Sequence, residues 1–138
     1  MHIGEGYRLL YSGGEKTGQK GVGIAISPEA YKTLTSWEAI SDSLMAATFR
    51  TPFRKLHVLS AYAPTNKRAT IAQKDEFYAK LESKIDALPK QDCVLLLADL
   101  NARVGPEPTR GLKGPHFMRN EAEANDNGCR VLDLMDSC

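Results

Sequence analysis

The segment Cys93–Asn101, which reads CVLLLADLN, carries the clearest indication of the fold. Its first six residues form a continuous apolar run, typical of a strand covered on both faces, so we predict a central strand at 93–98. The run leads into Asp99 and Asn101, and residues two apart in an extended chain leave it on the same face. A carboxylate that can take a proton and an amide that can orient a water are therefore expected together at a strand end, where α/β proteins commonly place functional sites.

Asp99 and Asn101 also have a simpler interpretation as turn residues. Asp and Asn commonly hydrogen-bond their own backbone just after a strand, and the spacing alone favours this interpretation. A second segment, residues 58–66 (VLSAYAPTN), adds a functional indication because it ends another predicted strand with polar groups around a proline. These groups are the Tyr62 phenol, the Thr65 hydroxyl and the Asn66 amide.

Outward from these two segments, the hydrophobic pattern predicts further strands and helices. The clearest helix opens with a capping box formed by Thr70 and Gln73 and is stopped by Pro89. The expected elements, in order, are strands 6–12 and 21–27, a short helix from Ser27 and Pro28, strands 43–50 and 55–63, helix 70–88, strand 93–98, a long loop over 105–125, and a helix capped by Asn127. This order indicates an α/β protein whose sheets are covered by helices.

The composition is typical of a soluble globular protein. With 138 residues, 42% of them hydrophobic and 25% charged, the chain is long enough for one domain and too short for two ordinary ones. Lys and Arg number 18 against 17 for Asp and Glu, so the formal net charge of +1 supplies no overall attraction for a polyanion. Any nucleic-acid binding is therefore expected from local basic patches.

Cysteine usage and the N-terminal residues bear on the compartment. The three cysteines, Cys93, Cys129 and Cys138, show no CxxC spacing and no His partner at ligand spacing, which argues against a structural zinc site. So sparse a set fits a reducing intracellular compartment, nuclear or cytoplasmic. The first residues show no secretory signal, and no apolar run approaches the ~18 residues that span a bilayer, so no membrane partner is expected.

Several short motifs together resemble the endonuclease/exonuclease/phosphatase superfamily. They are GYRLLYSGGEKTGQKGVGIAIS at 6–27, LSAYAPT at 59–65, KDEFYAKL at 74–81, LLLADLNARVG at 95–105 and NDNGCRVLDL at 125–134. In particular, the chain resembles the apurinic-type endonuclease domain of non-long-terminal-repeat retrotransposons, a reverse transcriptase-associated domain, including craniofacial development protein 2-like proteins. The resemblance implies a four-layered α/β sandwich, in which two mixed β-sheets are flanked by helices, and Mg²⁺-dependent nicking of DNA.

The resemblance also implies roles for individual residues. Asp99 matches the catalytic aspartate that activates or protonates a group at the scissile phosphate, and Asn101 matches its partner amide. Tyr62 matches the tyrosine that contacts that phosphate. The resemblance also implies nucleic-acid contacts for Thr65, Asn66 and Arg103. Thr65 stands where many relatives have Asn.

Two parts of the family's site have no match in this sequence. The family takes a metal-binding Glu from a segment early in the domain and a His from an Asp-His pair on its last strand. Glu5 follows no buried strand, and none of the histidines is expected to substitute: His2, His57 and His116. We therefore expect residues 1–138 to form a single incomplete domain, a partial sandwich truncated at both ends, without its main metal ligand and inactive alone.

Three functions remain open from the sequence. The first is a fragment of a Mg²⁺-dependent DNA endonuclease that hydrolyses phosphodiesters. The second is a degenerate remnant that binds nucleic acid or a protein and catalyses nothing. The third is a phosphomonoesterase or phospholipid-type phosphodiesterase of the same superfamily. Basic residues near the predicted turns form either a phosphate track or a solvated rim: Arg50, Arg54, Lys55, Lys67, Arg68 and Arg103.

Overall fold

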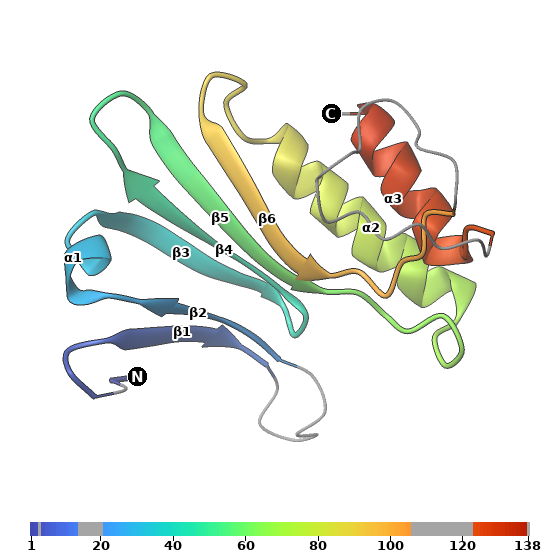
Figure 1. Ribbon diagram of the computed structural model, residues 1–138, viewed down its shortest axis with the longest axis horizontal. Helices are drawn as coiled ribbons and strands as arrows, with labels where there is room; N and C mark the ends of the chain where they lie inside the picture. Colours follow the sequence, from blue (N-terminus) through green and yellow to red (C-terminus); the bar gives the residue numbers. More distant parts are fainter. Residues whose placement is uncertain (3, 14–20, 106–122, 138) are drawn as a thin grey trace. The chain divides into compact units, whose positions relative to one another are not determined.

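Strands and helices alternate along the chain in the computed structural model, which describes residues 1–2, 4–13, 21–105 and 123–137. These residues form a two-stranded sheet, a four-stranded sheet and three helices (Figure 1). The chain divides into two compact units, the first made of residues 1–62 and 87–98 and the second of residues 63–86 and 99–138. The predicted α/β class is confirmed, and the elements are those expected of a partial α/β sandwich.

The first unit contains the strands and one short helix. The two-stranded sheet pairs β1 (Arg8–Ser12) with β2 (Val22–Ile26) in antiparallel register, which confirms the predicted hairpin. The four-stranded sheet has the order β3 (Leu34–Ser41), β4 (Leu44–Arg50), β5 (Lys55–Tyr62) and β6 (Cys93–Asp99). Between the sheets in sequence lies α1 (Pro28–Tyr31), and the hydroxyl of Ser27 accepts the Ala30 N–H, as predicted for an N-cap.

The core of the first unit lies between the hairpin and one face of β4 and β5. Its buried members are Leu10, Ile26, Met45, Ala47, Phe49 and Val58. Met45, Ala47 and Phe49 alternate along β4, so they share one face, and the intervening Leu44 and Ala46 are buried on the other. β4 is therefore covered on both faces.

β3 was not predicted from the sequence. Its burial pattern shows that most of its side chains are exposed, including Trp37 at 47%, and it pairs antiparallel with β4 at the edge of the sheet. An exposed edge strand needs neither an apolar run nor a strict alternation of apolar and polar residues, so the periodicity that reveals buried strands is missing.

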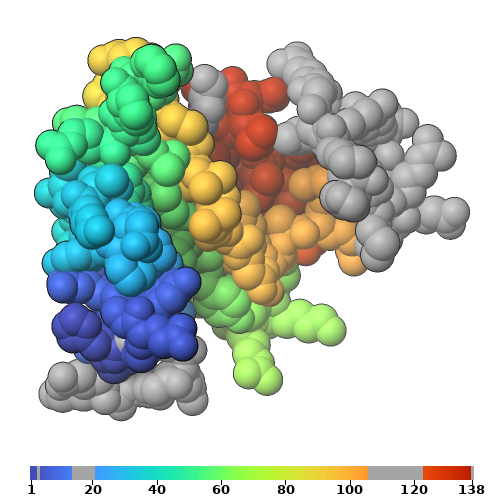
Figure 2. All heavy atoms as spheres, turned by 60° about the vertical axis from the view of Figure 1, so that its left-hand side comes forward, coloured from blue at the N-terminus to red at the C-terminus, as the bar shows by residue number. Residues whose placement is uncertain are grey.

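The predicted central position of β6 is wrong. In the described part of the chain, β6 stands at the other end of the sheet, beside β5 alone. Figure 2 shows the β6 segment (yellow to orange) at the surface, and the apolar residues Leu95 and Leu97 are 44% and 53% exposed. A continuous apolar run is the pattern of a doubly covered strand, but the neighbours that would cover it are not specified by the run itself.

His57 is a packed residue in the middle of β5. Its Nε2 lies 3.0 Å from Oδ2 of Asp92, and its Nδ1 lies 3.0 Å from the hydroxyl of Thr48, the residue paired with it on β4. Asp92 also accepts the backbone N–H of Lys55 at 3.1 Å. The hydrogen bond from His57 holds the pKa of Asp92 below its ordinary value, with a smaller contribution from the Lys55 N–H. These bonds tie the turn before β6 to β5.

The buried His57–Asp92 pair predicts a loss of stability in acid. A carboxyl whose pKa is lowered by folding stabilises the folded state above its ordinary pKa, about 4, and this stabilisation disappears as the pH falls through the lowered value. Urea unfolding between pH 6 and 3 should therefore show a smaller fall in the free energy of unfolding for Asp92→Asn than for the unchanged protein. Equal slopes for the two proteins would contradict this assignment.

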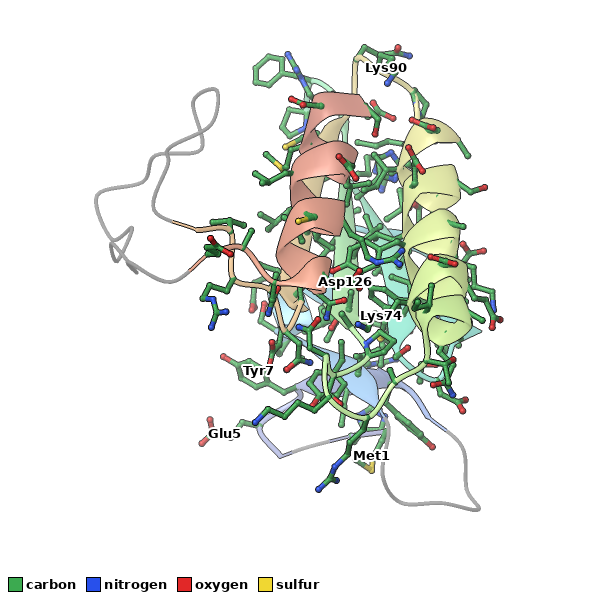
Figure 3. All side chains as sticks on the ribbon, turned by 90° about the vertical axis from the view of Figure 1, so that its right-hand side faces the viewer. Met1, Glu5, Tyr7, Lys74, Lys90 and Asp126 are labelled. Carbon is green, nitrogen blue, oxygen red and sulfur yellow. The ribbon has the colours of Figure 1, made fainter. Side chains whose placement is uncertain are left out.

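The second unit contains two longer helices. α2 (Ile71–Asp86) opens with the predicted capping box, in which Thr70 N–H donates to Gln73 Oε1 and Gln73 N–H donates to Thr70 Oγ1. α3 (Asp126–Ser137) lies beside α2, as Figure 3 shows, and a 2.6 Å ion pair joins Arg130 to Asp75. In the described residues no helix is both long enough and apolar enough to cross a bilayer.

Two predictions concern the segment before α3. The cap of α3 is Asn125 and not Asn127, because the Asn125 side-chain oxygen accepts the Gly128 N–H at 2.7 Å. Asn127 lies inside the first turn and is fully buried. The predicted loop at 105–125 falls largely on residues 106–122, which lie outside the described residues together with His116.

Candidate functional site

Asp99 and Asn101 form a tight turn directly after β6. The backbone N–H of Asn101 donates to Oδ1 of Asp99 at 2.9 Å, and Asn101 adopts a left-handed φ of 47°. This is the turn that the simpler interpretation of the sequence predicted. Asp99 is exposed, so the same carboxylate that stabilises the turn is also accessible to a ligand.

The loops that follow β5 and β6 are joined by hydrogen bonds within the second unit. Ala63 N–H donates to the Asp99 carbonyl at 2.9 Å, and the Asn101 side-chain amide donates to the Ala63 carbonyl at 2.8 Å. The nitrogen of the Asn101 amide is therefore used inside the protein. Asn101 could therefore contact a substrate only through its side-chain oxygen, or act indirectly through the shape of the loop.

Three further asparagines converge on a single atom of this loop, the carbonyl oxygen of Asn101. Their side-chain nitrogens lie at 2.7 Å for Asn66, 3.2 Å for Asn125 and 3.5 Å for Asn127. They come from the loop after β5 and from the start of α3, far apart in the sequence. Sequence reasoning singled out Asn66 as a nucleic-acid contact and Asn127 as a cap, and it missed this shared acceptor.

Lys74 of α2 connects this cluster to α3. It is buried, with 5% of its surface exposed, and its Nζ donates to Asp126 Oδ2 at 2.9 Å and to Asn66 Oδ1 at 3.4 Å. Figure 3 shows the Lys74 and Asp126 side chains at the same end of the two helices. The hydrogen bond from Lys74 holds the pKa of Asp126 below its ordinary value, and Arg130 adds to the effect. The carboxylate therefore remains charged at neutral pH.

Tyr78, one turn further along α2, supports the same loop. Its hydroxyl lies 3.5 Å from the Leu100 carbonyl and 3.4 Å from the Asn127 carbonyl. Burial raises the pKa of Tyr78 to about 12, against a smaller lowering by Arg130. The phenol thus keeps its proton at neutral pH and remains a hydrogen-bond donor to these carbonyls.

The backbone of Arg103 is packed against the first turn of α3. Arg103 N–H donates to Asn125 Oδ1 at 3.0 Å, and Asn125 N–H donates to the Arg103 carbonyl at 2.9 Å. A Cβ on Gly128 would lie 1.9 Å from that carbonyl oxygen, so the approach requires glycine. The Arg103 Nε donates to the Glu123 carbonyl at 2.8 Å. The side chain predicted to contact nucleic acid therefore already has a partner within the protein.

The two remaining predicted residues lie in or beside the loop after β5. Tyr62 is the last residue of β5 and belongs to the first unit, where its N–H donates to the Ser43 carbonyl at 2.9 Å and 37% of its surface is exposed. Thr65 is half-buried in the second unit, and its carbonyl accepts the Ala69 N–H at 3.1 Å. The second unit thus holds every predicted site residue except Tyr62: Thr65, Asn66, Asp99, Asn101 and Arg103.

The described residues offer a Mg²⁺ ion no cluster of three ligating side chains. Mg²⁺ prefers oxygen ligands in near-octahedral geometry and is usually held by one or two carboxylates. Among residues 1–2, 4–13, 21–105 and 123–137, no three His, Cys, Asp or Glu side chains gather closely enough to hold a metal. Asp99 is the carboxylate of the turn, and Asp126 is already paired with Lys74 and Arg130.

Comparisons with known proteins agree with the resemblance seen in the sequence. No family model matches the chain. Craniofacial development protein 2 is 24% identical in Tragulus javanicus and 25% identical in Bos taurus, each over 126 residues that make up 91% of this chain and 21% of the relative. The chain therefore spans about a fifth of the length of these curated relatives.

The structural comparison identifies the fold. The chain superposes on the endonuclease domain of TRAS1, a telomere-specific non-LTR retrotransposon, with a TM-score of 0.61 and 14% sequence identity. The match covers 95% of this chain and 52% of the TRAS1 chain. The described elements therefore have the arrangement found in about half of that retrotransposon endonuclease domain.

Proposed function

We propose that this chain forms part of a DNA endonuclease domain that hydrolyses phosphodiester bonds. The observation that carries the proposal is the turn at the end of β6, where the exposed Asp99 carboxylate and Asn101 are held in one hydrogen-bonded loop. The fold that this chain shares with the TRAS1 endonuclease domain supports it. A protein with this activity would act inside the cell, in the nucleus or cytoplasm, with DNA as its partner.

The chemistry of phosphodiester hydrolysis explains why this turn matters. A phosphodiester anion repels an attacking hydroxide, so an active site needs a positioned base, donors aimed at the developing charge, and a cation. Asp99 would either take a proton from the attacking water or give one to the leaving oxygen. Asn101 would help to position the Asp99 carboxylate. Tyr62 would donate its phenolic proton to a phosphate oxygen, the role that the resemblance assigns to it.

The remaining predicted contacts would serve less directly. The Thr65 hydroxyl would donate a hydrogen bond to a neighbouring phosphate. The oxygen and the nitrogen of the Asn66 amide both have hydrogen-bond partners within the protein, so Asn66 would act by holding the loop in place. Mg²⁺ is proposed from the resemblance alone.

A plasmid-nicking assay tests the proposal. The protein, expressed with any native flanking sequence, should convert supercoiled plasmid to relaxed circles in the presence of Mg²⁺ and stop when EDTA is added. A folded preparation that leaves the plasmid supercoiled over a range of Mg²⁺ concentrations would overturn the proposal.

A second candidate, a nucleic-acid-binding module without catalysis, is favoured by one observation. The part of the chain that the structure describes holds no three-residue cluster of metal-ligating side chains. Exposed basic residues would supply the binding in that case: Arg50, Arg54, Lys55, Lys67 and Arg68. Salt-sensitive DNA binding without cleavage would select this function, since phosphate contacts weaken steeply with ionic strength.

A further inference from the structure

Lys74 is too deeply buried for an ordinary surface lysine. A buried ammonium is stable only when it is paired, and its partners here are Asp126 and Asn66. We infer that Lys74 is a positioning residue, which acts through Asn66 to hold the Asp99–Asn101 turn in its working geometry. This inference rests on the proposed endonuclease function.

The link runs through the orientation of one amide. Asn66 Oδ1 accepts from Lys74 Nζ at 3.4 Å and from the Asn127 N–H at 3.3 Å, so this end of the amide must be the oxygen. The nitrogen then faces the Asn101 carbonyl at 2.7 Å, the shortest of the three asparagine bonds to that oxygen. Lys74 therefore helps to determine which way the Asn66 donor points.

The turn needs such support because of its backbone conformation. Asn101 has a φ of 47°, a left-handed conformation that asparagine tolerates better than most residues. The hydrogen bonds to its carbonyl help to hold the backbone in this conformation. If the Asn66 bond is lost, the loop that carries Asp99 and Asn101 gains freedom. A displacement of about 1 Å at reacting groups lowers turnover by roughly 100-fold.

The Lys74 ammonium can be removed without leaving the Asp126 carboxylate unpaired. Asp126 keeps an ion pair with Arg130 at 3.0 Å, and its side chain is 47% exposed. Methionine is an unbranched, flexible apolar side chain that adapts to irregular core space. Lys74→Met should therefore fold, with the polar link to Asn66 removed.

The test compares three variants of the protein carrying any native flanking sequence. Lys74→Met should lower kcat for plasmid nicking by roughly 10- to 100-fold. KM and its salt dependence should be almost unchanged, because the Lys74 side chain is buried and leaves no exposed charge for a phosphate. Hydrogen exchange of the peptide covering 99–103 should become faster. Lys74→Arg, which keeps a cationic donor, should restore part of kcat. Lys80→Met, which removes an exposed ion pair with Glu76 on the same helix, should behave as the unchanged protein.

Asn66→Asp replaces Lys74→Met in the test if Lys74→Met does not fold. It keeps an oxygen for Lys74 but sets a second oxygen against the Asn101 carbonyl, so it should reproduce the low kcat and the faster exchange. Unchanged kcat and exchange in a folded Lys74→Met or Asn66→Asp protein would overturn the positioning role. If the unchanged protein does not nick DNA, the proposed function fails, and hydrogen exchange still decides whether Lys74 holds the turn.

Discussion

Replacing Asp99 with asparagine is expected to reduce nicking by roughly 100- to 10,000-fold, the range of contributions made by a general acid or base. The replacement has the same shape, and its side-chain oxygen can still accept the Asn101 N–H that closes the turn. The loop is therefore expected to keep its structure, while the group that exchanges a proton is removed. Single-turnover nicking rates, with the fold checked by hydrogen exchange over 99–103, measure the two effects separately.

Asp99→Ala provides the matched comparison. It removes both the charge and the hydrogen bond of the turn, so it should also speed exchange at Asn101. Asp99 would be a turn residue only, as the simpler interpretation of the sequence holds, if Asp99→Asn nicked DNA as well as the unchanged protein and Asp99→Ala did not.

The second large effect is expected at Gly128. In an exposed helix, alanine stabilises by about 1 kcal/mol relative to glycine. Here the added Cβ would lie 1.9 Å from the Arg103 carbonyl oxygen and 2.6 Å from its carbon. The backbone must therefore move, and overpacking of this kind destabilises by roughly 1–3 kcal/mol or more. Gly128→Ala should lower the free energy of unfolding in urea and break the bonds between Arg103 and Asn125.

Cys129→Ala tests whether the effect is specific to that contact. Cys129 is the next residue of the same helix turn, and its side chain is exposed, so its replacement should change stability by only a few tenths of a kcal/mol. The loop from Asn101 to Arg103 should exchange faster in Gly128→Ala and remain protected in Cys129→Ala. Equal or greater stability of Gly128→Ala would show that the loop is not held against α3 as described.

Local sequence patterns determined a large part of this protein. The hairpin of β1 and β2, the Ser27 cap, the Thr70–Gln73 capping box and the position of Asp99 at a strand end were all predicted and are all present. Each depends on residues close together in the chain, whose hydrogen bonds and periodicity can be inferred without knowing what packs against them.

Only the tertiary structure decided which strands stand at the edges and what holds the turn. The exposed β3 has no apolar pattern to reveal it, and β6 has the pattern of a central strand but an edge position in the described chain. The Asn101 carbonyl is bonded by asparagines up to 35 positions away, and Lys74 reaches Asp126 across 52 positions. Local propensity contains no information about such pairings, because their partners meet only when the chain has folded.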